Sequence, residues 1–151
     1  MTQWVQEWIK ELSRPNEVTG VAECPFAQKA WDQGAVKVVE SQHLWDAVHR
    51  EVEGFGEHKV VMCVQPDPEQ DYEELEAACA ALNRWFAFKG MDIWLLSYQI
   101  DHAIVFIQTL SELDSASVAL EKLGYYQHYD SEDYDRLIAQ RRLLRQGATH
   151  A

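Results

Sequence analysis

Hydrophobic residues recur along this chain with two alternating periods, which predict where helices and strands lie. Between residues 3 and 12 they return every three or four positions, as on one face of an amphipathic helix. The run AVKVVE at 35–40 predicts a short strand, and an amphipathic helix capped by Ser41 and closed by Gly54 follows it. KVVMCVQ at 59–65 is apolar nearly throughout, as in an interior strand covered on both faces.

The middle of the chain carries the clearest helix pattern. After the turn-forming sequence Asp67-Pro68-Glu69-Gln70, apolar side chains step by three and four along one stripe, and the helix ends at Gly90. This stripe consists of Tyr72, Leu75, Cys79, Leu82 and Phe86. Two β-rich runs, 91–99 and 103–110, then predict an antiparallel hairpin with a three-residue loop.

Two further helices are predicted in the last third of the chain, separated by a short aromatic segment. A capping box at Ser111 opens the first helix, which ends before Gly124. YYQHY at 125–129 is aromatic and alternating, which predicts an edge strand. The last helix begins at Ser131, with acids at its start and arginines at its end, as the helix dipole favours.

The order of these elements predicts the fold class. From residue 58 to 129 they run strand, helix, strand, strand, helix, strand, which is the βαββαβ unit of the ferredoxin-like superfold. An extra strand and helix precede this unit, so we expect an α+β sandwich in one domain, 1–151, with 1–34 as a helical extension and 35–145 as sheet and helices. The alternative is a three-layer α/β arrangement in which strands 35–40 and 59–65 are parallel. Neither fold assigns a function.

Length and charge narrow the function classes. At 151 residues one hydrophobic core suffices for a single domain. The formal net charge of −12 disfavours nucleic acid and anionic membranes as direct partners, because both attract basic surfaces. The charge is uneven: residues 40–76 hold 11 of the 25 acids and only two cations, whereas the last helix ends in Arg141, Arg142 and Arg145. This polarity favours a basic protein, or a second copy of the chain, as a partner.

The chain shows no sequence signal for membrane insertion or secretion. No apolar run approaches the roughly 20 residues of a membrane span. The acid-bearing amphipathic N-terminus is typical of neither a signal nor a transit peptide, so we expect a cytoplasmic protein. The three cysteines, Cys24, Cys63 and Cys79, include no CxxC pair, and free thiols are expected in a reducing compartment.

Cys24 is the first candidate site residue. It lies just before a short helix that Pro25 is expected to begin, and the amides of a helix N-terminus lower the pKa of a thiol. Such a thiolate would act as a nucleophile, a redox sensor or a metal ligand. The alternative is a small buried side chain packed beneath the aromatic residues that follow. Cys63, in an apolar strand, and Cys79, on a helix core stripe, are expected to be packing residues.

Two of the six histidines are further candidates. His102 follows Asp101 in the hairpin loop, where the two form either an acid–base pair or a solvated turn. His128 lies among tyrosines on the predicted edge strand, where it lines either a pocket or the surface. No histidine spacing suits a local zinc site, the Gly-rich phosphate loops and the GxSxG elbow are absent, and the sequence assigns neither a metal nor a cofactor.

One segment of the chain resembles a known family. WVQEWIKEL is followed by ECPFAQKAW, which contains Cys24-Pro25-Phe26-Ala27, and then by a strand, a helix and a second strand. This order is similar to that of a family of uncharacterised bacterial proteins, which carry an amphipathic N-terminal helix and a Cys-Pro-Phe-Ala motif before an α+β domain. The resemblance covers about the first two-thirds of the chain and implies an α+β fold. The family has no established activity, so it implies no function.

Three functions remain open from the sequence. The first is a binding or accessory protein that acts through a protein partner or a small ligand, which suits the missing catalytic motifs and the many aromatic residues. The second is a small enzyme built as a dimeric α+β barrel around a small organic molecule or haem, with Cys24, His102 and His128 as its candidate residues. The third is an acidic decoy that binds a nucleic-acid-binding protein.

Overall fold

The computed structural model describes most of the chain. The described residues are 2–13, 27–56 and 60–150. The chain divides into two units, Met1–Val36 and Lys37–Ala151, and the sheet belongs to the second except for Val36, the first residue of β1.

The first unit contains two helices, α1 (Thr2–Ser13) and α2 (Ala27–Asp32). Three side chains on one face of α1, Val5, Ile9 and Leu12, are at most 4% exposed, which confirms the predicted amphipathic helix. The predicted start of the second helix, at Pro25, lies outside the described residues.

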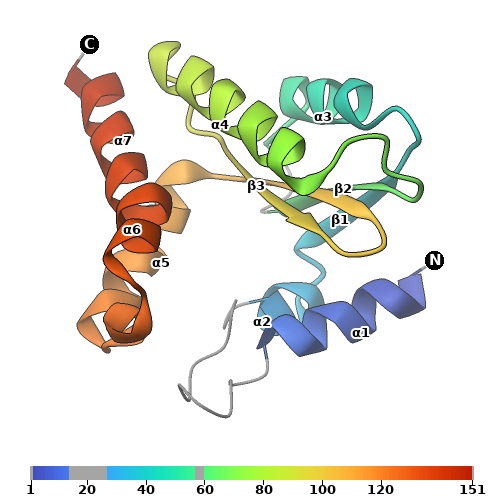
Figure 1. The fold of residues 1–151 in the computed structure, drawn as a ribbon, viewed down its shortest axis with the longest axis horizontal. Helices are drawn as coiled ribbons and strands as arrows, with labels where there is room; N and C mark the ends of the chain where they lie inside the picture. Colours follow the sequence, from blue (N-terminus) through green and yellow to red (C-terminus); the bar gives the residue numbers. More distant parts are fainter. Residues whose placement is uncertain (1, 14–26, 57–59, 151) are drawn as a thin grey trace. The chain divides into compact units, whose positions relative to one another are not determined.

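The sheet and the remaining helices follow in the order that Figure 1 shows. In chain order these elements are β1 (Val36–Glu40), α3 (Leu44–Glu53), β2 (Val60–Gln65), α4 (Tyr72–Phe88), β3 (Trp94–Gln99), β4 (Ala103–Gln108), α5 (Leu110–Lys122), η1 (Tyr125–His128), α6 (Ser131–Tyr134), the π-helical turn η2 (Asp135–Ala139) and α7 (Gln140–His150). All four strands predicted before residue 110 are present, and the α+β class is confirmed.

The strands form one mixed sheet in the order β1-β2-β4-β3. β4 pairs antiparallel with both β2 and β3, which confirms the predicted hairpin and makes β3 an edge strand. The backbone N–H of Ser41, directly after β1, donates to the carbonyl of Val64 near the end of β2 at 2.9 Å. β1 and β2 therefore end at the same edge of the sheet, as the parallel pair of the alternative arrangement would.

The prediction of an edge strand at 125–129 is wrong. Gly124 takes a left-handed conformation with φ of 83°, and η1 then forms a 3-10 turn. The rings of Tyr125, Tyr126 and Tyr129 pack on one another, and the Tyr126 hydroxyl lies 2.7 Å from the hydroxyl of Ser117 on α5. The aromatic alternation thus reflects a ring cluster beside α5. Because this segment adds no strand and β1 borders β2, the ferredoxin-like βαββαβ topology is not confirmed.

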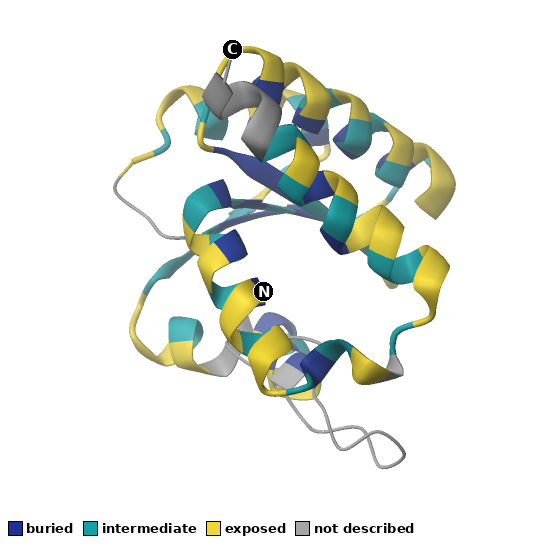
Figure 2. Cartoon of the chain, turned by 90° about the vertical axis from the view of Figure 1, so that its left-hand side faces the viewer, coloured by how far each residue is buried: buried dark blue, intermediate teal, exposed yellow. Residues whose placement is uncertain are grey.

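The main core lies between the sheet and the two helices α3 and α4, which cover one of its faces (Figure 1). Its strand residues are Val61, Cys63, Leu95, Ala103, Val105 and Ile107, joined by Ile93 just before β3, and its helix residues are Leu44, Ala47, Val48, Leu75, Cys79 and Phe86. The central strands β2 and β4 are mostly buried, whereas most residues of β1 and β3 are intermediate, and the helices in Figure 2 carry both buried and exposed residues. Met62, Val64 and Ile104 on the opposite face are at most 1% exposed, so β2 is covered on both faces as predicted.

Two helices begin at residues other than the predicted caps. The side chain of Ser41 accepts from the N–H of His43, but His43 is itself the residue before α3. Ser111 lies inside α5, and its N–H donates to the carboxylate of Asp92 at 2.7 Å. A residue from the far side of the hairpin therefore caps α5. Within the described residues no helix is both long enough and apolar enough to cross a membrane.

Candidate functional site

The three site residues predicted from the sequence differ in what the structure says of them. Cys24 lies outside the described residues, and so does the side chain of His128 at the end of η1. His102 is described, and it lies in the turn between β3 and β4. In Figure 1 that turn and the helices α5 and α6 lie beyond opposite ends of the hairpin, and η1 directly follows α5. The fold therefore does not bring His102 and η1 together.

His102 contacts Asp101 in the hairpin turn. The imidazole Nδ1 lies 2.8 Å from the carboxylate Oδ1, and the side chains are 20% and 83% exposed. This hydrogen bond lowers the pKa of the Asp101 carboxyl below its ordinary value. An imidazole oriented by a carboxylate has the form of a general acid or base, and the exposed Asp101 carboxylate equally suits a solvated turn, so both alternatives stay open.

Cys63 and Cys79 are packing residues, as predicted. Their exposed fractions are 0% and 3%, and burial raises the pKa of each thiol to about 12. A thiol that stays protonated at neutral pH is neither a nucleophile nor a metal ligand. Neither cysteine therefore belongs to a candidate site.

A polar layer closes the core at the sheet edge where β1, β2 and β3 end. Gln65 at the end of β2 and Gln99 at the end of β3 both pair with Ala103 of β4. Residues paired across a sheet point to the same face, so both glutamine side chains point toward the α3 and α4 side, where Ala103 joins the core. Gln65 is only 2% exposed, and a buried amide of this kind requires hydrogen-bond partners.

Two loop glutamines supply those partners, and the four residues Gln42, Gln65, Gln70 and Gln99 form what we call the glutamine cluster. The Gln65 amide nitrogen donates to the backbone carbonyl of Gln42 at 3.1 Å, and its oxygen accepts from Gln70 at 3.1 Å. The Gln99 amide nitrogen donates to the carbonyl of Gln70 at 3.3 Å. Its buried oxygen has no hydrogen-bond partner among the described residues. These bonds fix the orientation of the amides and leave one acceptor unused.

The glutamine cluster borders an open pocket of about 220 Å³ between the β1–α3 and β2–α4 loops. Its lining residues are Gln42, His43, Leu44, Trp45, Asp46, Gln65, Glu69 and Gln70. Two of them, Asp46 and Glu69, are carboxylates, and the described lining contains no lysine or arginine. Ligands of open α/β sheets bind at the carboxyl ends of the strands, which is where this pocket lies. Its chemistry favours a ligand that donates hydrogen bonds or carries positive charge.

Sequence reasoning missed the glutamine cluster because its members lie in four separate segments. A signal was present, since two of the predicted strands, 59–65 and 91–99, end in glutamine. Only the shared partner Ala103 shows that these two side chains occupy one row.

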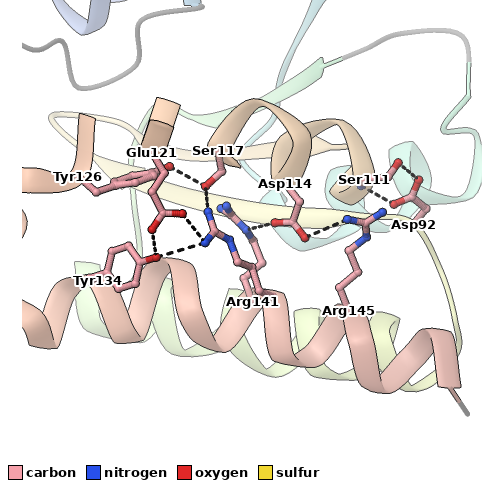
Figure 3. Close-up of polar contacts among 10 residues, drawn as sticks. Asp92, Ser111, Asp114, Ser117, Glu121, Tyr126, Tyr134, Arg141 and Arg145 are labelled. Atoms are coloured by element: carbon pink, nitrogen blue, oxygen red, sulfur yellow. Dashed lines mark hydrogen bonds and ion pairs between the residues drawn. The ribbon is translucent and has the colours of Figure 1, made fainter. Parts of the chain in front are cut away.

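A second polar cluster joins α5 to α7, and Figure 3 shows its members. The Arg141 Nε donates to the Asp114 carboxylate at 2.7 Å, and both side chains are 4% exposed. Arg145 lies 3.5 Å from the other oxygen of Asp114. Ser117 and Glu121 lie one and two turns after Asp114 on α5. Arg142 of α7 donates to both, to Glu121 at 2.7 Å and to Ser117 at 3.0 Å.

This cluster changes the interpretation of the arginines at the end of the chain. They are not a basic end free to meet a partner, because Asp114 and Glu121 of α5 hold them. Hydrogen bonds from Tyr134 and Arg142 lower the pKa of the Glu121 carboxyl, which keeps it charged. A shallow pocket of about 240 Å³ lies beside Glu121 and Tyr134. The cluster therefore links α5 to α7.

In the part of the chain that the structure describes, no three His, Cys, Asp or Glu side chains converge as metal ligands do. No family model, no curated protein and no solved structure matches this chain. The resemblance of its first segment to a bacterial family therefore stays a prediction, and the function rests on geometry.

Proposed function

We propose that this chain is a cytoplasmic binding protein whose site is the pocket beside the glutamine cluster. The observation that carries the proposal is the fixed row of amides at the carboxyl ends of the strands, in which buried Gln65 and its partners Gln42 and Gln70 all line the pocket. The free, buried thiols of Cys63 and Cys79 suit a reducing compartment.

Amide side chains suit binding better than catalysis. They neither titrate at neutral pH nor act as nucleophiles, but each presents two donors and an acceptor in fixed positions. Because hydrogen bonds within the glutamine cluster hold these groups before a ligand arrives, little rotamer entropy is lost on binding. A rigid amide row therefore supplies specificity.

The carboxylates of Asp46 and Glu69 define the ligand class. They flank a lining without lysine or arginine, so the pocket repels anions and attracts donor-rich groups. Its volume of about 220 Å³ limits the part of the ligand that enters to a few heavy atoms. We therefore expect a small amine, amide or guanidine group, either as a free molecule or as a side chain of a larger one.

Nuclear magnetic resonance on the labelled protein tests the proposal. Small primary amines, amides and guanidines are titrated one by one, with small carboxylates as the contrasting class. We expect at least one donor-rich compound to shift the side-chain amide signals of Gln42, Gln65 or Gln70 and the indole signal of Trp45. Carboxylates are expected to leave these signals in place.

A pair of variants locates the site. Gln70→Ala removes the donor to Gln65 and should weaken binding about tenfold or more, because the row loses its fixed orientation. Gln140→Ala removes an amide that contacts Asp135 of η2, far from the pocket lining; it is the matched control and should bind normally. Equal affinity of both variants, or no donor-rich compound shifting these signals, would reject the proposed site.

The second candidate function is an enzyme that uses the His102–Asp101 pair as its acid or base, which the 2.8 Å contact favours. The dimeric barrel form of this hypothesis has less support, because the turn that carries His102 and the segment η1 lie beyond opposite ends of the hairpin. The test is to incubate a donor-rich ligand with the protein and with its His102→Gln variant. If both bind the ligand and leave it chemically unchanged, the result favours a binding protein over an enzyme.

A further inference from the structure

The outer face of α4 is exposed and carries large apolar side chains. Its exposed residues after the first helical position are Glu73, Glu74, Ala77, Ala81, Arg84, Trp85 and Phe88. Their spacing of three, four and seven places them on one side of the helix, opposite the buried Leu75, Cys79 and Phe86. Trp85 is 52% and Phe88 77% exposed, with ring centroids 6.0 Å apart. Single exposed apolar residues are common, but a stacked aromatic pair on a continuous helix face is typical of a docking surface.

Charge along this face has a direction. The acids lie in its first half and the cations in its second, where Lys89 also sits over the Trp85 ring at 4.7 Å. Glu73 and Arg84 are eleven residues apart, close to three helical turns, so they lie on the same flank of the helix. In the described part of the chain neither Glu73 nor Arg84 makes an ion pair. Both charges are therefore available to a partner.

Such a pattern is complementary to itself. When two copies of a helix pack antiparallel about a twofold axis, each flank meets the same flank of the other copy in reverse order. An axis midway between Ala77 and Ala81 brings Glu73 of each copy opposite Arg84 of the other. The two alanines, at the crossing point, let the helix backbones approach, and each aromatic pair covers the acidic half of the other helix.

We propose that two copies of this chain associate through the outer faces of α4, antiparallel, with Glu73 and Arg84 as reciprocal ion pairs and Trp85 and Phe88 as apolar anchors. A basic or acidic foreign partner would match only one half of the face, whereas a second copy matches both. This inference does not depend on ligand binding, because Gln70 and the other members of the glutamine cluster lie before α4 or on other elements.

The interface is small. A helix of 17 residues is about 25 Å long, so a single helix pair lies at the low end of the areas that specific interfaces bury. We therefore expect a reversible dimer with a dissociation constant in the micromolar range, and association that weakens as salt screens the ion pairs.

Sedimentation velocity of the full chain over a range of micromolar concentrations tests the proposal. The wild type should show a concentration-dependent dimer. Arg84→Glu places two acids opposite each other, and Glu73→Arg places two cations opposite each other, so each variant should weaken association about tenfold or more. The double variant Glu73→Arg/Arg84→Glu restores opposite charges in both copies and should recover association to within about threefold of the wild type.

Controls separate this interface from others. Arg50→Glu on α3 makes the same change of charge as Arg84→Glu at another exposed position and should leave the dimer unchanged. Trp85→Ser should abolish the dimer while circular dichroism shows an intact fold. A wild-type monomer at all concentrations, or a double variant no better than the single ones, would overturn the proposal. Gln70→Ala should dimerise normally, so loss of ligand binding and loss of the dimer are distinguishable.

Discussion

The side-chain amide of Asn83 on α4 brackets the backbone of Leu95 on β3. Its oxygen accepts from the Leu95 N–H at 2.7 Å, and its nitrogen donates to the Leu95 carbonyl at 3.0 Å. β3 is an edge strand of the sheet, and edge strands carry backbone groups that no neighbouring strand satisfies. Asn83, at 4% exposure, thus does for part of this edge what a further strand would do.

Replacing Asn83 with leucine should destabilise the protein by about 2–3 kcal/mol, because both backbone groups of Leu95 lose their partner in a buried place. Urea unfolding measures the change in the free energy of unfolding. Lys122→Leu at an exposed position of α5 is the control and should change it by less than about 0.5 kcal/mol. If Asn83→Leu and Lys122→Leu had equal unfolding free energies, the hydrogen bonds between Asn83 and Leu95 would not contribute to stability.

Among the charged residues of the second unit, we expect substitution of Asp114 to lower the free energy of unfolding most. Asp114→Asn leaves Arg141 charged and buried without its partner, and we expect a loss of about 3–5 kcal/mol in unfolding free energy. The double variant Asp114→Leu/Arg141→Met removes both charges and should recover a large part of this loss. Glu112→Gln, at an exposed position on the same helix, is the control. If Asp114→Asn changed the unfolding free energy only slightly, the ion pair would not be important for stability.

The thiols of Cys63 and Cys79 should not react in the folded protein. Their pKa of about 12 keeps them protonated at pH 8, and burial blocks access. In the Cys24→Ser variant, a colorimetric thiol reagent should therefore detect no thiol in the native state and two after denaturation. Reaction of either thiol in the native state at the rate of a free cysteine would show that the core opens.

The Asp101 carboxyl should titrate below 3.8, its ordinary pKa, because His102 donates to it. A lowered pKa in the folded state stabilises the fold at pH above 3.8, and this contribution disappears as the pH falls through the folded-state pKa. The carboxyl carbon shift of Asp101, followed by nuclear magnetic resonance, measures the midpoint. We expect His102→Ala to raise it toward 3.8. His43→Ala, which removes a histidine from another loop, should leave the midpoint unchanged.

Local pattern was sufficient for the regular elements. The stripe from Tyr72 to Phe86 predicts α4 because a helix exists only when one face can be buried, and Leu75 and Cys79 are indeed on the buried side. The two apolar runs around His102 predict the hairpin because the loop between them is short. In both cases neighbours in sequence are the physical cause.

The same reasoning failed where distant residues decide. YYQHY suits either a strand or a turn, and the φ of 83° at Gly124 together with the Tyr126–Ser117 contact selects the turn. Ser111 has the sequence of a capping residue, yet Asp92 from before the hairpin accepts its N–H. Propensity is weak compared with tertiary contacts, so short segments follow their surroundings.

By itself the sequence determined the α+β class, the hairpin and the packing roles of Cys63 and Cys79, since each follows from periodicity or from burial of an apolar stretch. Only the tertiary structure decided the sheet order and the position of the glutamine cluster. Gln65 and Gln99 become neighbours because both pair with Ala103, and strand register depends on long-range hydrogen bonds. A site assembled from several strands and loops exists only once the sheet has formed.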